Sequence, residues 1–253
     1  MSTKVFKQIP GSFVGLNVSP DFMRTFRERT EAFLSMFNHA DAFFGDSLFT
    51  CSKSMGFLTD EKFRGIVDKN AVNEIEETTI WRTHVLCWAA ESALAVDGDF
   101  VECGCYLGFS ASCIADFVNF AASERHYYLY DVFENPPEAH DLEHHGPDLH
   151  EQVEARFADF PNITVTKGVV PAILDQVAPE KIAFMHIDMN SVTAEIGALE
   201  RLFDRVTAGG MIVLDDYGWS NYRPQKEAHD RFFAERGLRV LDMPTGQGLV
   251  IKR

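Results

Sequence analysis

The chain has 253 residues, of which 46% are hydrophobic and 24% charged, which suits one large globular domain or one domain with an appendage. Its formal net charge of −15 argues against nucleic acid and anionic membranes as partners, since both need clusters of Lys and Arg. No apolar run is long enough for a transmembrane helix and the N-terminus lacks the apolar core of a signal peptide, so we expect a cytoplasmic protein.

The first part of the chain, residues 1–95, predicts a helical N-terminal extension. Residues 21–45 predict an amphipathic helix with phenylalanines at positions 22, 26, 33, 37 and 44, and residues 60–69 and 73–96 predict further helices. A stripe of phenylalanines is typical of a core or of an oligomer interface rather than of a ligand site, so we expect the extension to contribute to a homo-oligomer contact.

The second part, residues 96–253, alternates predicted strands and helices, which indicates an α/β domain with helices on both faces of a mostly parallel sheet. Strands are predicted at 99–103, 126–131, 162–166, 182–188, 210–215, 238–242 and 247–252. Helices are predicted at 108–121, 149–159, 170–177, 193–206 and 223–236. The turn between the last two strands is too short for a parallel crossover, so the seven-stranded sheet should end in an antiparallel hairpin.

The first of these strands leads into a glycine turn that is typical of a nucleotide-type cofactor site. Gly104 allows a tight turn and close approach of a ligand, while Glu102 directly before it would suit a cationic group such as the ammonium of a methionine moiety. Tyr106 stands where a dinucleotide-binding turn has glycine, which disfavours NAD. Asp131 ends the next strand, where an acid accepts hydrogen bonds from ribose hydroxyls, and Gly168 ends the third, where an adenine edge could lie.

Three acidic residues follow the fourth and fifth strands of the predicted sheet. Asp188 ends one strand, and Asp215 and Asp216 end the next. Because the carboxyl ends of neighbouring parallel strands meet at one edge of the sheet, these carboxylates should converge. Oxygen ligands alone favour Mg²⁺ or Ca²⁺ over zinc, so the pattern predicts a Mg²⁺ site; the alternative is that Asp188 and Asp215 cap backbone and Asp216 faces solvent.

A polar loop after Asp131 is rich in histidine. A histidine there could take a proton from a substrate hydroxyl near neutral pH, and a surface loop without such a role is the alternative. The sequence does not choose among His140, His144, His145 and His150.

The five cysteines predict no metal site and no disulfide framework. Cys103 and Cys105 are separated by one residue, but no second pair or histidine set completes a zinc site. An odd number of cysteines, three of them in the apolar segment 103–113, indicates reduced, buried thiols.

These motifs resemble the macrocin O-methyltransferase (TylF/MycF-type) family of Mg²⁺- and S-adenosylmethionine-dependent sugar methyltransferases. The resemblance covers roughly residues 97–253 and is most specific where Gly209-Gly210 is followed by Asp215-Asp216-Tyr217-Gly218. Further similar segments are Gly98-Asp99-Phe100-Val101-Glu102-Cys103-Gly104, Asp131-Val132-Phe133-Glu134-Asn135-Pro136-Pro137, Lys167-Gly168 and Pro244-Thr245-Gly246-Gln247-Gly248.

The resemblance implies a Rossmann-like methyltransferase fold that transfers a methyl group from S-adenosylmethionine to a hydroxyl of a small molecule, such as a sugar or glycosylated natural product. It implies cofactor contacts by Glu102, Gly104, Gly108, Ser110, Asp131, Gly168 and Asp188. It implies Mg²⁺ ligands at Asp188, Asp215 and Asp216, and catalytic roles for Asp188 and a loop histidine, namely His140, His144 or His145.

The chain also departs from the family pattern in two segments. Tyr106-Leu107-Gly108-Phe109 replaces a W-R-G-G pattern, and Asp188-Met189-Asn190 with the residues after it replaces D-G-D-L-Y-E-S-T. The resemblance also implies that the N-terminal region, residues 1–95, helps to form the acceptor pocket. Because this region is dissimilar, it and the two departures together predict a different methyl acceptor. Two alternative functions are a nicotinamide-dependent oxidoreductase and a non-catalytic interaction protein that keeps the fold.

Overall fold

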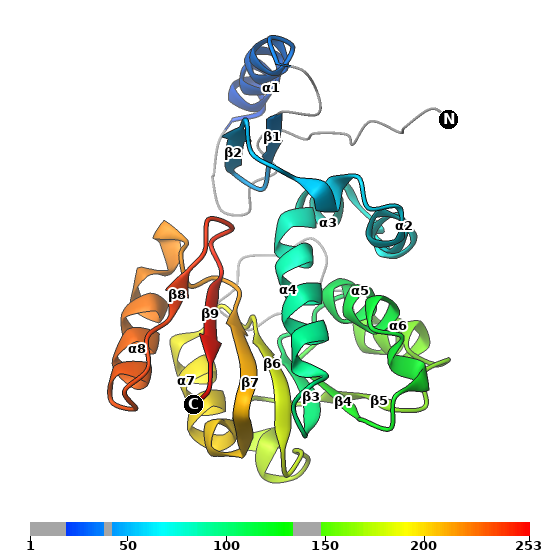
Figure 1. The fold of residues 1–253 in the computed structure, drawn as a ribbon, viewed down its shortest axis with the longest axis vertical. Coiled ribbons are helices and arrows are strands. Elements are labelled where there is room, and N and C mark those ends of the chain that lie inside the picture. Colours follow the sequence, from blue (N-terminus) through cyan, green and yellow to red (C-terminus); the bar gives the residue numbers. More distant parts are fainter. Residues whose placement is uncertain (1–18, 38–41, 134–147) are drawn as a thin grey trace. The chain divides into compact units, whose positions relative to one another are not determined.

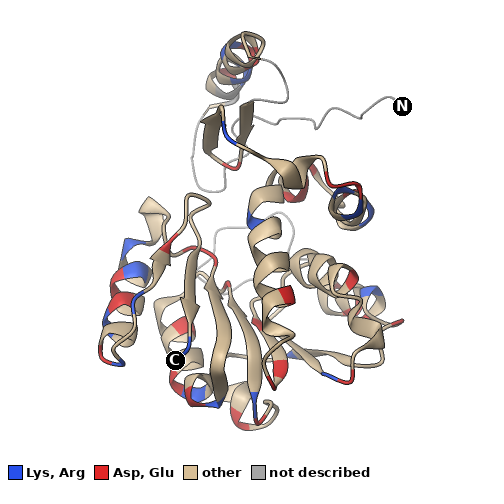
Figure 2. Cartoon of the chain, viewed as in Figure 1, with Lys and Arg blue, Asp and Glu red and all other residues tan. Residues whose placement is uncertain are grey.

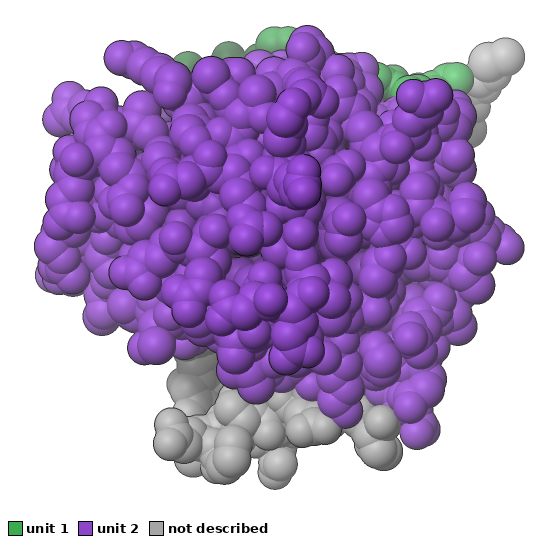
Figure 3. Space-filling view, turned by 90° about the horizontal axis from the view of Figure 1, so that it is seen from below, with its two compact units in different colours: residues 1–84 green, residues 85–253 purple. Residues whose placement is uncertain are grey.

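The computed structural model describes residues 19–37, 42–133 and 148–253. The chain forms two compact units, residues 1–84 and 85–253, which Figure 3 colours green and purple. Helix α4 (Ile80–Ala93) begins in the first unit and ends in the second. No helix in the described part is both long and apolar enough to span a membrane.

The first unit contains helices and a β-hairpin, and it corrects the long helix predicted over residues 21–45. Helix α1 (Pro20–Leu34) starts at Ser19, whose hydroxyl accepts the Phe22 N–H, and it is followed by strands β1 (Ala42–Gly45) and β2 (Leu48–Cys51). The two residues between the strands have positive φ, the conformation of the tightest hairpin turns. The predicted helix is therefore wrong beyond Leu34, because the phenylalanines continue past the end of α1 into the strands.

The rest of the first unit is helical, and the start of α4 contacts the hairpin. Helices α2 (Glu61–Asn70) and α3 (Glu74–Thr78) follow, and the helix predicted over 73–96 is divided at Thr79 between α3 and α4. Arg82 forms a bidentate ion pair with Asp46, at 2.6 and 3.0 Å, and both side chains are almost buried. A planar guanidinium that matches a carboxylate in this way fixes the start of α4 to the hairpin turn.

The second unit is built on a seven-stranded sheet in the order β5-β4-β3-β6-β7-β9-β8 (Figure 1). Its strands are β3 (Asp99–Cys103), β4 (Tyr127–Asp131), β5 (Ile163–Lys167), β6 (Ile182–Ile187), β7 (Val206–Leu214), β8 (Leu241–Asp242) and β9 (Gly248–Ile251). The first five are parallel, and β9 runs antiparallel to both β7 and β8. The predicted Rossmann-like fold with an antiparallel C-terminal hairpin is confirmed.

The helices of this unit are α5 (Phe109–Phe117), α6 (Leu149–Arg156), α7 (Val192–Leu202) and α8 (Arg223–Ala234). The segment 170–177, predicted as a helix, forms only a short 3₁₀ turn at Ala172–Asp175. Every residue of β6 is buried, as expected for a central strand with both faces covered. Figure 2 shows both signs of charge along α8, the solvated outer side of the fold.

One core fills the face of the sheet that α7 and α8 cover. It includes Met185 and Ile187 from the sheet, Leu199 from α7 and Phe233 from α8. Full burial of each such side chain stabilises the fold by about 1.5–3 kcal/mol. This packing fixes the strand ends from which the candidate site is built.

Candidate functional site

The predicted site residues are held at one edge of the sheet by hydrogen bonds that continue the ladder past the strand ends. The N–H of Gly104 donates to Tyr130 O at 2.8 Å, and that of Gly168 to Asp131 O at 2.9 Å. In the same way, the N–H of Asp188 donates to Cys103 O at 2.8 Å, and that of Asp215 to Ile187 O at 2.9 Å. The carboxyl ends of five strands therefore present their side chains in fixed register, as ligand sites in open α/β sheets require.

The glycine turn after β3 lies against the end of β6. Gly104 has φ 92°, and a Cβ added there would lie 1.8 Å from the carbonyl oxygen of Asp188. Gly108 precedes α5 with φ 75°, and a Cβ there would lie 2.7 Å from the Phe157 ring. Both glycines thus serve the packing of the turn, and Ser110 lies half-buried in the first turn of α5.

The carboxylate of Asp131 organises the backbone of this turn. It accepts the Tyr106 N–H at one oxygen and the Phe133 N–H at the other, both at 2.8 Å. Tyr106 and Phe133 have positive φ, a conformation that costs non-glycine residues energy unless other contacts hold it. A carboxylate has about four lone-pair sites, so these bonds leave acceptor capacity for ribose hydroxyls, the role that the sequence predicts.

The side chain of Glu102 is buried inside the protein and not exposed at the edge of the sheet. Its side chain is 1% exposed, and Oε2 accepts a hydrogen bond from the Tyr127 hydroxyl at 2.6 Å. The buried carboxylate and the loss of solvent together raise the pKa of Tyr127 well above its usual value, with desolvation the larger cause. The predicted contact between Glu102 and the cofactor remains a prediction.

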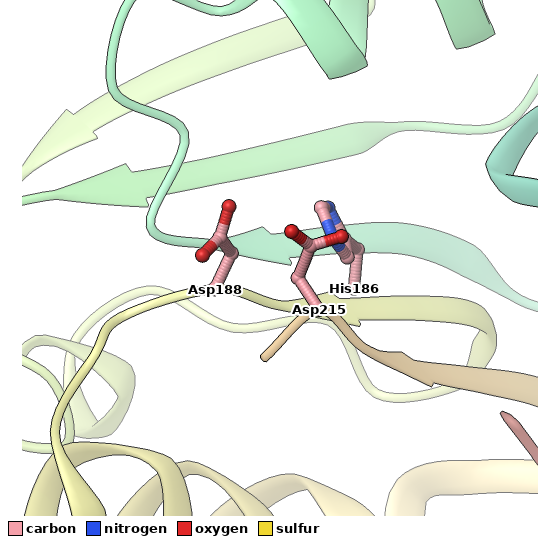
Figure 4. A group of neighbouring side chains, drawn as sticks. All are labelled: His186, Asp188 and Asp215. Carbon is pink, nitrogen blue, oxygen red and sulfur yellow. The ribbon is translucent and has the colours of Figure 1, made fainter. Parts of the chain in front are cut away.

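Two of the three predicted metal ligands converge next to this turn. Asp188 and Asp215, together with His186, form a group whose candidate donor atoms all lie within 4.8 Å of one another (Figure 4). Asp216 is half-buried and is not a member of this group, although its Oδ2 atom is buried. The cluster therefore offers two carboxylates that suit Mg²⁺, and a histidine to which the sequence interpretation gave no role.

His186 lies between two carboxylates on neighbouring strands. Its Nδ1 is 3.5 Å from Glu102 Oε2 and its Nε2 is 3.5 Å from Asp215 Oδ1, and neither contact is aligned as a hydrogen bond. Burial alone lowers the pKa of His186, but the charges of Glu102 and Asp215 outweigh it and raise the pKa well above the usual value. The imidazole thus links the carboxylate beside the glycine turn to the carboxylate after β7.

Asp215 is also oriented by the C-terminal hairpin, at the same oxygen that faces His186. Gln247 donates its amide N–H to Asp215 Oδ1 at 2.9 Å, and its own carbonyl accepts the Thr245 hydroxyl at 2.9 Å. Thr245 thereby fixes which end of the Gln247 amide faces the carboxylate. Gln247 is fully buried, so Oδ1 is engaged inside the protein.

The predicted catalytic histidines cannot be placed, because His140, His144 and His145 lie outside the described residues. His150 is described and belongs to α6, where its ring lies 4.9 Å from that of Phe133. Phe133 follows the Asp131 turn, so this histidine lies near the predicted cofactor loop.

The sequence analysis missed two supporting residues, His186 and Gln247, and only His186 had a local signal. His186 stands two residues before Asp188, so both point to the same side of a strand, and its register partner on β3 is Glu102. Gln247 belongs to the Pro244–Gly248 motif, but its contact with Asp215 depends on the antiparallel pairing of β9 with β7.

The thiols give a prediction about accessible chemistry. Cys103 and Cys105 are buried, and desolvation, with Glu102 or Asp131 nearby, raises the pKa of both thiols well above the usual value. Thiolate is the reactive form, and a raised pKa means that it is absent below strongly alkaline pH. At pH 8 we expect iodoacetamide to modify only half-buried Cys51 rapidly in the native protein, and all five cysteines after denaturation, as measured by peptide mass spectrometry. Rapid native labelling of Cys103 or Cys105 would contradict this.

Comparison with known proteins gives one family and a set of similar structures. The family model described as macrocin-O-methyltransferase (TylF) matches residues 86–243. A comparison with curated proteins finds no match.

The similar solved structures share the fold at low sequence identity. The O-methyltransferase NovP is 18% identical with a TM-score of 0.59, covering 70% of this chain and 81% of its own. CalS11, a TDP-rhamnose 3′-O-methyltransferase of calicheamicin biosynthesis, is 14% identical with a TM-score of 0.55, covering 93% and 96%. TomG, an O-methyltransferase from Streptomyces achromogenes solved with S-adenosylmethionine, is 12% identical with a TM-score of 0.51, covering 77% and 91%.

Proposed function

This chain belongs to the macrocin-O-methyltransferase (TylF) family of S-adenosylmethionine-dependent methyltransferases, and from that premise we propose that it methylates a hydroxyl of a small molecule with the help of Mg²⁺. The acceptor is a sugar or a glycosylated natural product. Similar folds in NovP, CalS11 and TomG, all O-methyltransferases, support the reaction type, and the sugar substrate named for CalS11, TDP-rhamnose, supports a sugar acceptor. Membership of this family favours a methyltransferase over the two alternatives, a nicotinamide-dependent oxidoreductase and a non-catalytic interaction protein.

The observation that carries the proposal is the convergence of Asp188 and Asp215 beside the glycine turn. Their donor atoms lie within 4.8 Å of each other, and the Asp188 carbonyl lies directly against Gly104. Carboxylate oxygens are the donors that Mg²⁺ prefers, and it needs few of them because it keeps several waters. Asp188 and Asp215 fit such an ion, with His186 as their buried neighbour. Asp216, the residue after Asp215, would be the third ligand.

The cofactor supplies an electrophilic methyl group, and Mg²⁺ when bound lowers the pKa of the attacking hydroxyl. The chain's own contribution is placement. Asp131 holds the turn that would carry the cofactor, with Glu102, Gly104, Gly108, Ser110, Gly168 and Asp188 as its other contacts. Holding the acceptor oxygen in line with the methyl group removes much of the entropic cost of bringing two reactants together. One of His140, His144 and His145 would accept the proton.

The N-terminal region, residues 1–95, would contribute the acceptor pocket or a homo-oligomer interface. Its α1 helix and β1–β2 hairpin present partly exposed rings, Phe33 and Phe49, with centroids 5.2 Å apart. Light scattering of the full chain tests the second role, because a monomer would exclude the interface.

Asp131→Ala should weaken cofactor binding. Removing the carboxylate frees the N–H groups of Tyr106 and Phe133, and hydrogen bonds to a charged group contribute about 1.5–3 kcal/mol each. We expect the Kd of S-adenosylhomocysteine to rise by about tenfold or more, measured by calorimetry. Asp159→Asn, at an exposed position, is the control; an unchanged Kd in Asp131→Ala would place the cofactor elsewhere.

The proposal is tested by turnover. Purified full-length protein is incubated with S-adenosylmethionine and a panel of sugars, nucleotide sugars and glycosylated aglycones, with Mg²⁺ or with EDTA, and S-adenosylhomocysteine and methylated product are quantified by mass spectrometry. Mg²⁺-dependent O-methylation supports the proposal. Methylation that is equal in EDTA would contradict the role of the metal, and transfer only to nitrogen or carbon acceptors would contradict the reaction type.

A further inference from the structure

A second buried polar cluster lies beneath the candidate site, between α7 and α8. Its members are Glu195, Gln225 and His229, which are 2%, 4% and 1% exposed. Glu195 Oε1 accepts the Gln225 amide N–H at 2.9 Å, and Oε2 lies 3.1 Å from His229 Nε2. A carboxylate is costly to bury without partners, so these contacts are what allow Glu195 to be inside the core.

Glu195 also reaches the loop that carries Asp188. Its Oε1 accepts the backbone N–H of Met189, the residue directly after Asp188, at 3.2 Å. Glu195 belongs to the first turns of α7, where a glutamate commonly bonds back to the backbone before the helix. Here the bond reaches past the N-cap Ser191 to the loop that follows β6, which ends at Ile187.

The same cluster contacts the loop after β7. The His229 ring stacks on that of Tyr217, with centroids 6.4 Å apart and an interplanar angle of 28°. Tyr217 directly follows Asp216, and its hydroxyl donates to Asp230 on α8 at 2.6 Å. Lys226, which is also on α8, makes a cation–π contact with Tyr217: its Nζ lies 3.5 Å from the centroid of the ring.

We propose that Glu195, acting through His229 and the Met189 amide, is a positioning residue that holds the Asp188 loop and the Asp215–Tyr217 loop in mutual register. The cluster bonds to the residue after Asp188 and packs on the residue after Asp216, so one buried carboxylate constrains both acid-bearing loops. Its described contacts are with Met189, Gln225 and His229, none of which is a predicted cofactor or metal residue. This register would set the affinity of the acidic residues for Mg²⁺, a consequence that rests on the proposed function.

Hydrogen exchange of the full chain tests the positioning role without relying on activity. We compare wild type with Glu195→Ala, Glu195→Gln and, as a matched control on the same helix, the exposed Glu200→Ala. In Glu195→Ala we expect exchange to accelerate about tenfold in peptides spanning 186–192 and 214–219, but not in the cofactor turn 103–110. Glu195→Gln keeps an amide oxygen for Met189 N–H and should show a smaller effect in both peptides.

The outcomes separate the inference from a general loss of stability. Acceleration confined to the two acid-bearing segments, with a raised Mg²⁺ requirement and an unchanged Kd for S-adenosylhomocysteine, supports it. Unchanged exchange in those segments, or an equal increase in 103–110, overturns it. If Glu195→Ala does not fold, the same comparison between Glu195→Gln and Glu200→Ala decides. Failure of the wild type to bind S-adenosylhomocysteine would refute the proposed function, while the exchange pattern would still decide the positioning role.

Discussion

Asp215→Asn should reduce Mg²⁺-dependent turnover by at least about 100-fold and leave the Kd of S-adenosylhomocysteine nearly unchanged. The substitution removes a charge from the two converging carboxylates, and a bound cation contributes several kcal/mol of charge stabilisation in the transition state. Asp215 follows β7, whereas the glycine turn follows β3, so the cofactor contacts are spared. Turnover and calorimetry on the same preparation provide the measurement.

Asp216→Ala should reduce Mg²⁺-dependent turnover to the same extent and also spare cofactor binding, if Asp216 is the third ligand. Asp216 is not in the group formed by His186, Asp188 and Asp215, so the comparison of the two variants identifies the ligand set. Exposed Asp159→Asn serves as the control for the change in charge. Loss of S-adenosylhomocysteine binding in both variants would show that the division between metal and cofactor residues is wrong.

Gly104→Ala should lower the free energy of unfolding by at least about 3 kcal/mol, among the largest effects of a single methyl group. The added Cβ would lie 1.8 Å from Asp188 O, which is backbone that cannot rotate away, and φ 92° is strained for alanine. Relief requires the glycine turn and the end of β6 to separate, so cofactor binding should be lost as well. Urea unfolding followed by circular dichroism measures the change.

Gly65→Ala is the matched control for that substitution. Gly65 lies within α2, and a Cβ added there meets nothing within 4 Å. Alanine in a helix interior is favoured over glycine by about 0.5–1 kcal/mol, so this variant should be as stable as the wild type or more stable. Equal stability of Gly104→Ala and Gly65→Ala would contradict the close contact between the turn and Asp188.

The strand ends could be predicted from sequence because local chemistry marks them. The strand segments end in an acid or a glycine at Glu102–Gly104, Asp131, Gly168, Asp188 and Asp215, and the parallel order follows from the alternation with helices. In the structure, the parallel register brings these positions to one edge of the sheet, as the sequence predicts.

The contacts that support the site depend on register and packing that no local pattern specifies. His186 meets Glu102 only because β3 and β6 pair in that register, and Gln247 meets Asp215 only because β9 returns antiparallel to β7. No local pattern marks Glu195 as a buried residue, yet it is buried against α8. The helix predicted over residues 21–45 includes β1 because the spacing of phenylalanines alone does not separate a helix from a strand.

Calorimetric titration of the wild-type protein with S-adenosylhomocysteine, with and without Mg²⁺, tests the central claim most directly. We predict micromolar binding of the cofactor product and a separate Mg²⁺ heat that is lost in Asp215→Asn. Absence of binding under both conditions would contradict the assignment of the glycine turn and Asp131 as a cofactor site, and would leave only the fold in common with the family.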